Sequence, residues 1–269
     1  MKLSRITAFS SSLLLGAVLA LTGAASAQAA PSAAAVDYVA LGDSYSSGVG
    51  SGSYDSASGN CLRTPKAYPA LWAAANSPSS FAFTACSGAR TGDVTAGQLG
   101  PLTSATDLVS ISIGGNDAGF ADVMTTCVLQ SEATCLSRVA TARAFVDSTL
   151  PGNLDSVYTA IRSKAPSARV VVLGYPRFYK LNGTCIAGLS ENERAAINGA
   201  SDYLNAATAK RAADHGFTFA SVAGGFTGHE ICSGSPWLHS VNLFNLTESY
   251  HPTSGGQVGG YLPAFASAA

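Results

Sequence analysis

Four short polar or glycine-rich motifs stand far apart in this chain of 269 residues. They are Gly42-Asp43-Ser44, Cys86-Ser87-Gly88, Gly114-Gly115-Asn116-Asp117 and Ser249-Tyr250-His251-Pro252. A serine hydroxyl is a poor nucleophile until a base removes its proton, and histidine is the most common base in such reactions. Ser44 and His251 could therefore attack an ester carbonyl together and form an acyl-enzyme.

The negative charge that develops on the carbonyl oxygen requires hydrogen-bond donors already aimed at it. The backbone amides of Ser44 and Gly88 and the side-chain amide of Asn116 could supply three such donors. A glycine at position 88 would leave no side chain to obstruct close approach of the backbone to the substrate. We therefore expect an oxyanion hole built from these three residues.

Each of these residues also has a structural interpretation. Asp43 or Ser44 could cap a helix in the turn after a strand, and Asn116 could cap another helix. Gly88 could serve only to permit a turn. For Asp117 we expect backbone hydrogen bonds rather than chemistry.

Three further histidines are candidates for the base. His215 stands at an expected helix end, where we expect it to cap carbonyl groups. His229 and His239 lie in a polar segment near the C-terminus. We favour His251 because the proline that follows it fixes the local backbone.

The motifs follow apolar runs that are typical of strands, which alternate with amphipathic helices. Strands are expected at Val36–Leu41, Phe81–Cys86, Asp107–Ile113, Arg169–Leu173 and Phe217–Val222. Helices are expected at Pro65–Ala75, at Arg138–Lys164 with an interruption at Pro151-Gly152, and from a capping box at Ser190 and Glu193 to about His215. This alternation predicts a parallel sheet covered on both faces, with its ligand at the carboxyl ends of the strands.

With these four motifs in this order, the chain resembles the SGNH, or GDSL, hydrolase family, whose blocks carry Ser, Gly, Asn and His. The resemblance covers the whole mature chain and implies a flavodoxin-like three-layer α/β/α sandwich with a central parallel sheet of about five strands. Within the family, the chain is similar to secreted actinobacterial lipases and phospholipases A1. That similarity includes the flank Gly-Asp-Ser-Tyr-Ser-Ser-Gly and the six cysteines.

One position departs from the family pattern. The family usually has Asp three residues before the histidine, where this chain has Glu248. In similar secreted relatives a main-chain carbonyl two residues before the histidine orients it instead, and this position is Ser249. We expect a dyad of Ser44 and His251 in which the Ser249 carbonyl accepts from the imidazole, with Glu248 as the alternative.

Residues 1–35 have the pattern of a secretory signal peptide. Lys2 and Arg5 precede an apolar run, and Ala-x-Ala sites follow at residues 25–29. Cleavage between about residues 27 and 35 leaves one domain, residues 36–269, of about 235 residues. The apolar run is too short for a stable membrane span, so we expect a secreted, extracellular protein with no transmembrane segment.

Charge and motifs exclude several classes of function. The chain has 15 basic and 16 acidic residues, and loss of Lys2 and Arg5 leaves 13 and 16, a net charge of −3. This balance gives no electrostatic footprint for nucleic acid. The glycine-rich stretch at residues 48–59 has neither a P-loop nor a dinucleotide-binding pattern, so we expect no cofactor, and the lack of a His-Glu-x-x-His motif excludes a metallohydrolase, so we expect no metal. We expect a monomer.

Six cysteines in an exported chain are expected to form three disulfides, although fifteen pairings are possible. The short separation favours Cys127–Cys135. We expect Cys61–Cys86 and Cys185–Cys232 because each pair would hold a polar, irregular segment, and the family resemblance implies the same pairs. A zinc site at Cys185, Cys232, His229 and His239 would lack the closely spaced ligand pairs of such sites.

Segments after the expected strands and before His251 are unusually apolar, which would suit an acyl chain around an open site. They contain Phe120, Val123, Met124, Val128 and Leu129; Tyr175, Phe178, Tyr179, Leu181 and Ile186; and Trp237, Leu238, Leu243, Phe244 and Leu246. We therefore expect a carboxylic-ester hydrolase that acts on acylglycerols or phospholipids and makes transient contact with the lipid interface. The alternatives are a carbohydrate acetylesterase of the same fold and a secreted binding module.

Overall fold

The centre of the fold is a parallel sheet of five strands in the order β2-β1-β3-β4-β5. The strands are β1 (Asp37–Gly42), β2 (Ser80–Phe83), β3 (Leu108–Ser112), β4 (Arg169–Leu173) and β5 (Thr218–Ala220). The computed structural model describes residues 36–242 and 244–269, so the expected signal peptide, residues 1–35, and Leu243 lie outside the described residues.

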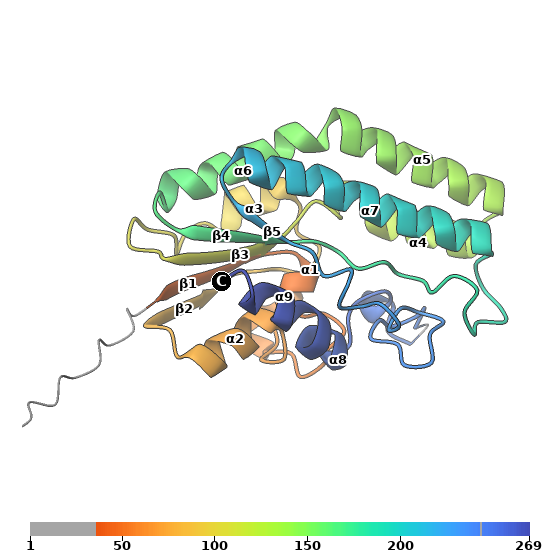
Figure 1. Ribbon diagram of the computed structural model, residues 1–269, viewed down its shortest axis with the longest axis horizontal. Coiled ribbons are helices and arrows are strands. Elements are labelled where there is room, and N and C mark those ends of the chain that lie inside the picture. The colour runs from red at the N-terminus through yellow and green to blue at the C-terminus, as the bar shows by residue number, and fades with distance from the viewer. Residues whose placement is uncertain (1–35, 243) are drawn as a thin grey trace, which may run out of the picture. The chain divides into compact units, whose positions relative to one another are not determined.

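Helices cover both faces of the sheet (Figure 1). One layer contains α3 (Thr91–Gly97), α4 (Phe120–Leu129), α5 (Glu132–Ser148), α6 (Leu150–Lys164) and α7 (Glu191–Asp214). The other contains α2 (Tyr68–Asn76), α8 (Ser254–Gly256) and α9 (Leu262–Ala266). Strand β3 is buried along its whole length and β4 along all but its first residue, as expected of central strands covered on two faces. The predicted three-layer α/β/α sandwich is confirmed.

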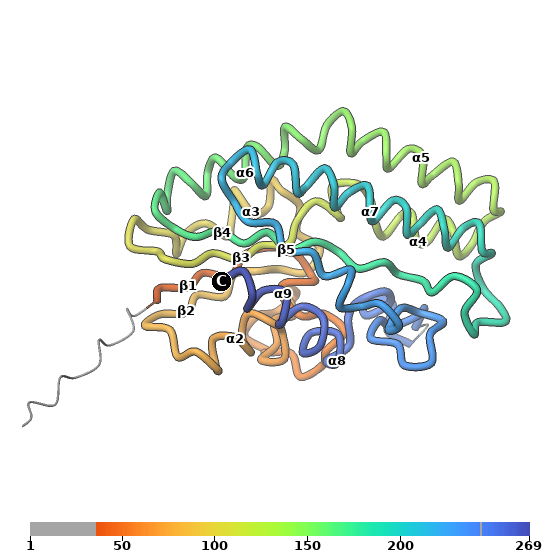
Figure 2. The backbone as a smooth tube through the Cα atoms, viewed as in Figure 1, coloured from red at the N-terminus to blue at the C-terminus, as the bar shows by residue number. Residues whose placement is uncertain are grey.

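The order of the strands determines where a ligand can bind. From β1 the chain passes to β2 on one side and then returns to β3 on the other side of β1. At such a switch point the loops after the two central strands diverge and leave a crevice at their carboxyl ends. The tube in Figure 2 shows the chain leaving these two strands at one edge of the sheet. The loops that diverge carry Ser44 and Asn116.

The structure agrees with most expected elements and corrects others. Strand β4 has the predicted bounds, and the capping box of Ser190 and Glu193 is formed at the start of α7. Helix α2 begins at Tyr68, so Pro69 rather than Pro65 lies in its first turn. The break between α5 and α6 is at Thr149, because Pro151 is tolerated in the first turn of a helix.

Two further differences concern residues 80–97. The second strand ends at Phe83 rather than at Cys86, and it is followed by an irregular segment. Helix α3 was not expected from the sequence, because its seven residues include two glycines, which are poor helix formers. The Asp93 carboxylate stabilises its start by accepting from the Arg90 N–H at 2.9 Å.

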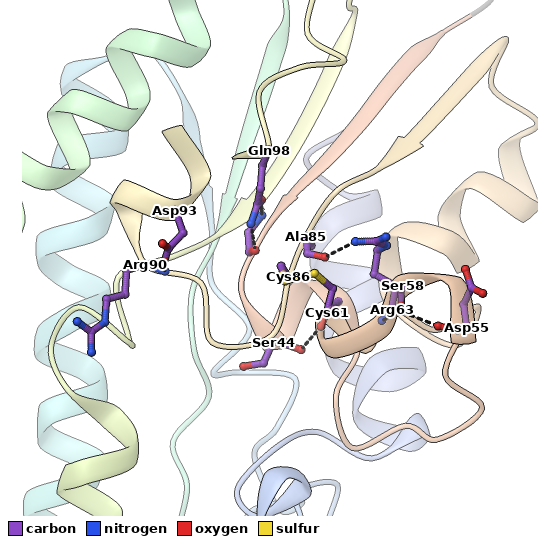
Figure 3. Close-up of a disulfide and its surroundings, with 12 residues drawn as sticks. Ser44, Asp55, Ser58, Cys61, Arg63, Ala85, Cys86, Arg90, Asp93 and Gln98 are labelled. Carbon is purple, nitrogen blue, oxygen red and sulfur yellow. Dashed lines mark hydrogen bonds between the residues drawn. A yellow bond between two sulfur atoms is a disulfide. The ribbon is translucent and has the colours of Figure 1, made fainter. Parts of the chain in front are cut away.

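Disulfides join Cys61–Cys86, Cys127–Cys135 and Cys185–Cys232, which are the expected pairs. The first connects a short 3₁₀ turn at Ser56–Cys61 to the segment after β2, near Ser44 (Figure 3). The Cys86 N–H donates to the Gly42 carbonyl at 2.9 Å, which holds that segment beside the end of β1. Among the described helices, none combines the length and hydrophobicity needed to cross a bilayer.

The last residue of β1, Gly42, is held by the side chain of Gln98, which Figure 3 shows at the end of the strand. The Gly42 N–H donates to Gln98 Oε1 at 2.7 Å, and Gln98 Nε2 donates to the Gly42 carbonyl at 2.9 Å. A Cβ at position 42 would lie 2.5 Å from the Ser112 carbonyl oxygen, so glycine allows the close approach of β1 and β3 here.

Replacing Gln98 with alanine is expected to lower the free energy of unfolding by about 2 kcal/mol, because the Gly42 N–H would be buried without a partner. Urea denaturation followed by circular dichroism measures this change. Gln130→Ala, at an exposed position, is the matched control and should change stability by less than about 0.5 kcal/mol. Equal stabilities of the two variants would contradict the role assigned to Gln98.

Candidate active site

Ser44 is the first residue of a one-turn helix, α1 (Ser44–Ser47), directly after β1. The Asp43 carboxylate caps this turn by accepting from the Tyr45 N–H at 3.0 Å. The turn ends at Gly48, which has φ +90° and donates its N–H to the Ser44 carbonyl. Strand and cap together hold Ser44 at the edge of the sheet, where only 6% of its surface is exposed.

His251 reaches Ser44 from a segment 207 residues further along the chain. Its Nε2 lies 2.7 Å from Ser44 Oγ. The segment is held by an isolated antiparallel bridge between Leu238 and Pro252 and by the His239 N–H, which donates to the His251 carbonyl at 3.0 Å. The two residues expected to react are therefore in hydrogen-bond contact.

The other ring nitrogen of His251, Nδ1, lies 3.1 Å from the Ser249 carbonyl oxygen. Tyr250, between these residues, has φ +67°, a left-handed conformation that folds the carbonyl back toward the imidazole. The Glu248 carboxylate instead accepts from the Tyr54 hydroxyl at 2.6 Å. A proton on Nδ1, donated to Ser249, leaves Nε2 free to accept from the Ser44 hydroxyl.

The pKa of His251 is lowered from 6.5 to about 4, mainly by burial and to a smaller extent by the nearby His239, while the hydrogen bond to the Ser249 carbonyl partly opposes both effects. His251 as a whole residue is partly exposed, but the protein around it excludes most of the water that would stabilise a positive charge on the imidazole. At neutral pH the imidazole is therefore uncharged, which is the form that can accept a proton.

The three expected oxyanion donors come from segments that are hydrogen-bonded to one another. Two residues before Gly88, Cys86 is bound to Gly42 as described above, and directly after Gly88 the Ala89 carbonyl accepts from Asn116 Nδ2 at 3.0 Å. Within residues 36–242 and 244–269, the backbone N–H groups of Ser44 and Gly88 have no hydrogen-bond partner. These two N–H groups and the second N–H of the Asn116 amide are available to an oxyanion.

The backbone conformation at position 88 explains why the residue there is glycine. Gly88 has φ +78°, a conformation that side-chain-bearing residues rarely adopt, and a Cβ there would meet no protein atom within 4 Å. The backbone conformation, rather than crowding by the protein, therefore favours glycine.

Asp43 is the centre of a buried hydrogen-bond network next to Ser44. Its carboxylate accepts from the hydroxyls of Tyr175 and Ser112, the latter at 2.7 Å. The Tyr175 hydroxyl also accepts from the Gly115 N–H at 3.2 Å, so it connects the turn after β1 to the turn after β3. Burial raises the pKa of Asp43 to about 6, while these donors partly offset that effect. Tyr175 was expected only as a substrate contact, because a bond between distant loops leaves no local signal.

The remaining polar candidates have structural partners. Asp117 accepts a backbone hydrogen bond, as expected, from the Thr91 N–H at the start of α3, and it also accepts from the Thr91 hydroxyl. His215 Nε2 lies 3.0 Å from Asp155 Oδ1. His229 stacks on Trp237 with ring centroids 3.6 Å apart, and its Nδ1 contacts the Ser235 carbonyl. The Cys185–Cys232 disulfide removes the thiolates that a zinc site would need.

An apolar pocket opens beside Ser44 and extends among α4, α5 and α7. Five residues expected around the substrate line it: Phe120, Val123, Met124, Tyr175 and Phe178. Helices α5 and α7 add further side chains that were not expected around the substrate, which are Ala142, Val146, Ile197, Ala200 and Leu204. A pocket with this lining suits an acyl chain.

The other residues expected around the substrate lie elsewhere. Tyr179, Trp237 and Leu238 pack into the protein away from this pocket. Six side chains are exposed, namely Val128, Leu129, Leu181, Ile186, Phe244 and Leu246. Apolar character alone could not separate pocket walls from core or surface.

Comparison with known proteins agrees with this geometry. Residues 40–257 match the model of the GDSL-like lipase/acylhydrolase family. The chain is 71% identical to Lipase 1 of Streptomyces coelicolor over the full length of both proteins.

Two solved structures are also similar. Phospholipase A1 from Streptomyces albidoflavus has 72% identity and a TM-score of 0.86, with 88% of this chain and 100% of that chain covered. The extracellular lipase from Streptomyces rimosus has 68% identity and a TM-score of 0.85, with 87% and 100% covered. The chain therefore belongs to the GDSL-like lipase/acylhydrolase family.

Proposed function

We propose that this protein is a secreted lipolytic carboxylic-ester hydrolase that releases fatty acids from acylglycerols or phospholipids. The observation that carries the proposal is the 2.7 Å contact between Ser44 Oγ and His251 Nε2 at the mouth of an apolar pocket. The names of the similar lipases and of the phospholipase A1 support the same substrate class.

Catalysis would begin when Ser44 attacks the ester carbonyl and His251 takes up its proton. The tetrahedral intermediate would collapse to an acyl-enzyme as His251 gives that proton to the leaving alcohol. Water would then attack the acyl group with the same base, releasing the fatty acid and restoring Ser44. The N–H groups of Ser44, Gly88 and Asn116 would stabilise both oxyanions.

In this mechanism the Ser249 carbonyl orients His251. A neutral acceptor selects the correct tautomer but stabilises the imidazolium less than a carboxylate would. The Ser249 oxygen at 3.1 Å from Nδ1 supports this role, and the engagement of Glu248 with Tyr54 argues against a direct one.

Extracellular location is part of the proposal. Three disulfides are present, and such bonds persist mainly in oxidising compartments. The similar Streptomyces rimosus enzyme is described as extracellular. We further propose that the protein acts as a monomer in transient contact with a lipid interface.

Ser44→Ala is expected to lower ester hydrolysis by at least about 10⁴-fold, because the nucleophile is removed. Fatty-acid release from triacylglycerol, phosphatidylcholine and p-nitrophenyl esters measures this loss, and Ser104→Ala, at an exposed position, is the control. Release of acetate from acetylated xylan without fatty-acid release would indicate an acetylesterase. Absence of any hydrolysis and of organophosphate labelling at Ser44 would indicate a binding module.

The pH dependence should reflect the low pKa of His251. The neutral imidazole is the active form, so kcat/KM should fall only as the pH drops through about 4. At pH 5.5 an ordinary histidine would be only about one-tenth neutral, and His251 almost fully so. A soluble short-chain ester assayed from pH 3 to 7, with circular dichroism as a control for folding, tests this. A small step near pH 6 would report Asp43, and a main step near 6.5 would contradict the prediction.

Ala200→Trp should reduce activity on long acyl chains selectively, because Ala200 lines the pocket and a tryptophan there would fill part of it. Exclusion of two or three methylenes costs about 2 kcal/mol, roughly a 30-fold fall in the ratio of palmitate to butyrate hydrolysis. Ala206→Trp, on an exposed position of the same helix, is the matched control. An unchanged ratio would show that the acyl chain binds elsewhere.

A further inference from the structure

The glycine-rich stretch after α1 has no role in the mechanism described so far. It runs from Gly48 to Tyr54, and its residues Gly50, Gly52 and Ser53 all have positive φ. These left-handed residues turn the chain so that the Tyr54 hydroxyl returns to the Gly50 N–H and accepts from it at 2.9 Å. The stretch is therefore a closed, internally bonded loop rather than an open one.

Two side chains from the segment that carries His251 hold this loop. The Tyr54 hydroxyl donates to Glu248 Oε1 at 2.6 Å. His239 Nε2 contacts the Gly50 carbonyl oxygen at 2.7 Å. Burial and the hydrogen bond to Glu248 raise the pKa of Tyr54 to about 12, so the phenol remains a donor throughout the neutral range.

Gly50 lies directly against the backbone of the expected base. A Cβ built on Gly50 would lie 2.5 Å from the Pro252 carbonyl oxygen and 3.0 Å from His251 Cβ. No side chain fits in this space, so the backbone of the loop packs directly against the backbone and Cβ of His251. If the loop moved away, the histidine would lose this support and could shift relative to Ser44.

We propose that Tyr54 and Glu248 are positioning residues, which form a brace that presses the glycine-rich loop against His251. The brace connects the segments that carry the two proposed catalytic residues. The loop continues directly from the α1 turn that carries Ser44, and Glu248 lies three residues before His251. The brace thereby fixes the distance between Ser44 Oγ and His251 Nε2. This inference rests on the proposed function of the same two residues.

The brace gives Glu248 a role that differs from that of a triad carboxylate. A triad carboxylate would contact His251 Nδ1, which here faces the Ser249 carbonyl. Glu248 acts instead through a neutral phenol and the loop behind the ring. Its contribution therefore requires a hydrogen-bond acceptor at position 248 but no negative charge.

Variants of the full chain separate these roles. Tyr54→Phe and Glu248→Ala each break the brace, and each should lower kcat on a soluble short-chain ester about 10- to 100-fold, the effect of misplacing a catalytic group by about 1 Å. KM should change little, because neither residue touches the substrate. Glu248→Gln keeps an acceptor for Tyr54 and should stay within about threefold of the wild type. The double variant should be no worse than the more damaged single one.

Tyr203→Phe is the matched control, because Tyr203 donates to Asp147 in an exposed tyrosine–carboxylate pair between α7 and α5. It should retain the wild-type kcat. Should Tyr54→Phe fail to fold, Glu248→Ala against Glu248→Gln makes the same comparison.

The brace is overturned if Tyr54→Phe retains the wild-type kcat, if Glu248→Gln is as damaging as Glu248→Ala, or if the two losses are additive. A loss near 10⁴-fold in Glu248→Gln would instead indicate a triad carboxylate. A wild-type protein that neither hydrolyses esters nor is labelled at Ser44 by an organophosphate would overturn the proposed function as well.

Discussion

The hydrogen bond between Ser44 and His251 joins two residues that are 207 positions apart in the chain. Other contacts must therefore bring the two segments together. Tyr45, the residue after Ser44, makes one of these contacts, because its hydroxyl donates to the Tyr250 carbonyl at 2.8 Å. Gln257 adds a second link, since its Nε2 donates to the Tyr45 carbonyl and its Oε1 accepts from the Tyr68 N–H. The C-terminal segment is thus bonded to the α1 turn itself, and this attachment holds His251 beside Ser44.

The parallel sheet holds Ser44 in place, because this residue directly follows β1. Strand β1 lies between β2 and β3, and its last residue, Gly42, is hydrogen-bonded to the Gln98 side chain and to the Cys86 N–H. Asp43 then contacts Tyr175 and Ser112 within the protein interior. A carboxyl group buried in this way is costly unless every oxygen has a donor. Its complete set of partners explains how an acidic residue can stand next to the nucleophile without leaving the core.

Much of the fold was predictable because it depends on local patterns. The apolar run at Arg169–Leu173 and the capping box at Ser190 are each contained within a few residues, and both have the predicted bounds. The Ser44–His251 contact was predictable only from the order of four motifs. What sequence analysis missed depends on contacts between distant residues: Tyr54 with Glu248, Tyr175 with Asp43, and the pocket walls on α5 and α7. Helical alanines such as Ala142 carry no pattern that distinguishes a pocket wall from a core contact.

The buried, weakly basic imidazole has a chemical consequence for an enzyme that makes acid. Each ester cleaved yields a carboxylic acid, so hydrolysis lowers the pH around the enzyme. With a pKa near 4, His251 would remain unprotonated while an ordinary histidine was already charged and inactive. In the described part of the chain the His251 Nδ1 faces the neutral Ser249 carbonyl rather than a carboxylate, which would raise that pKa, so the proposed base would keep its active form as acid accumulates.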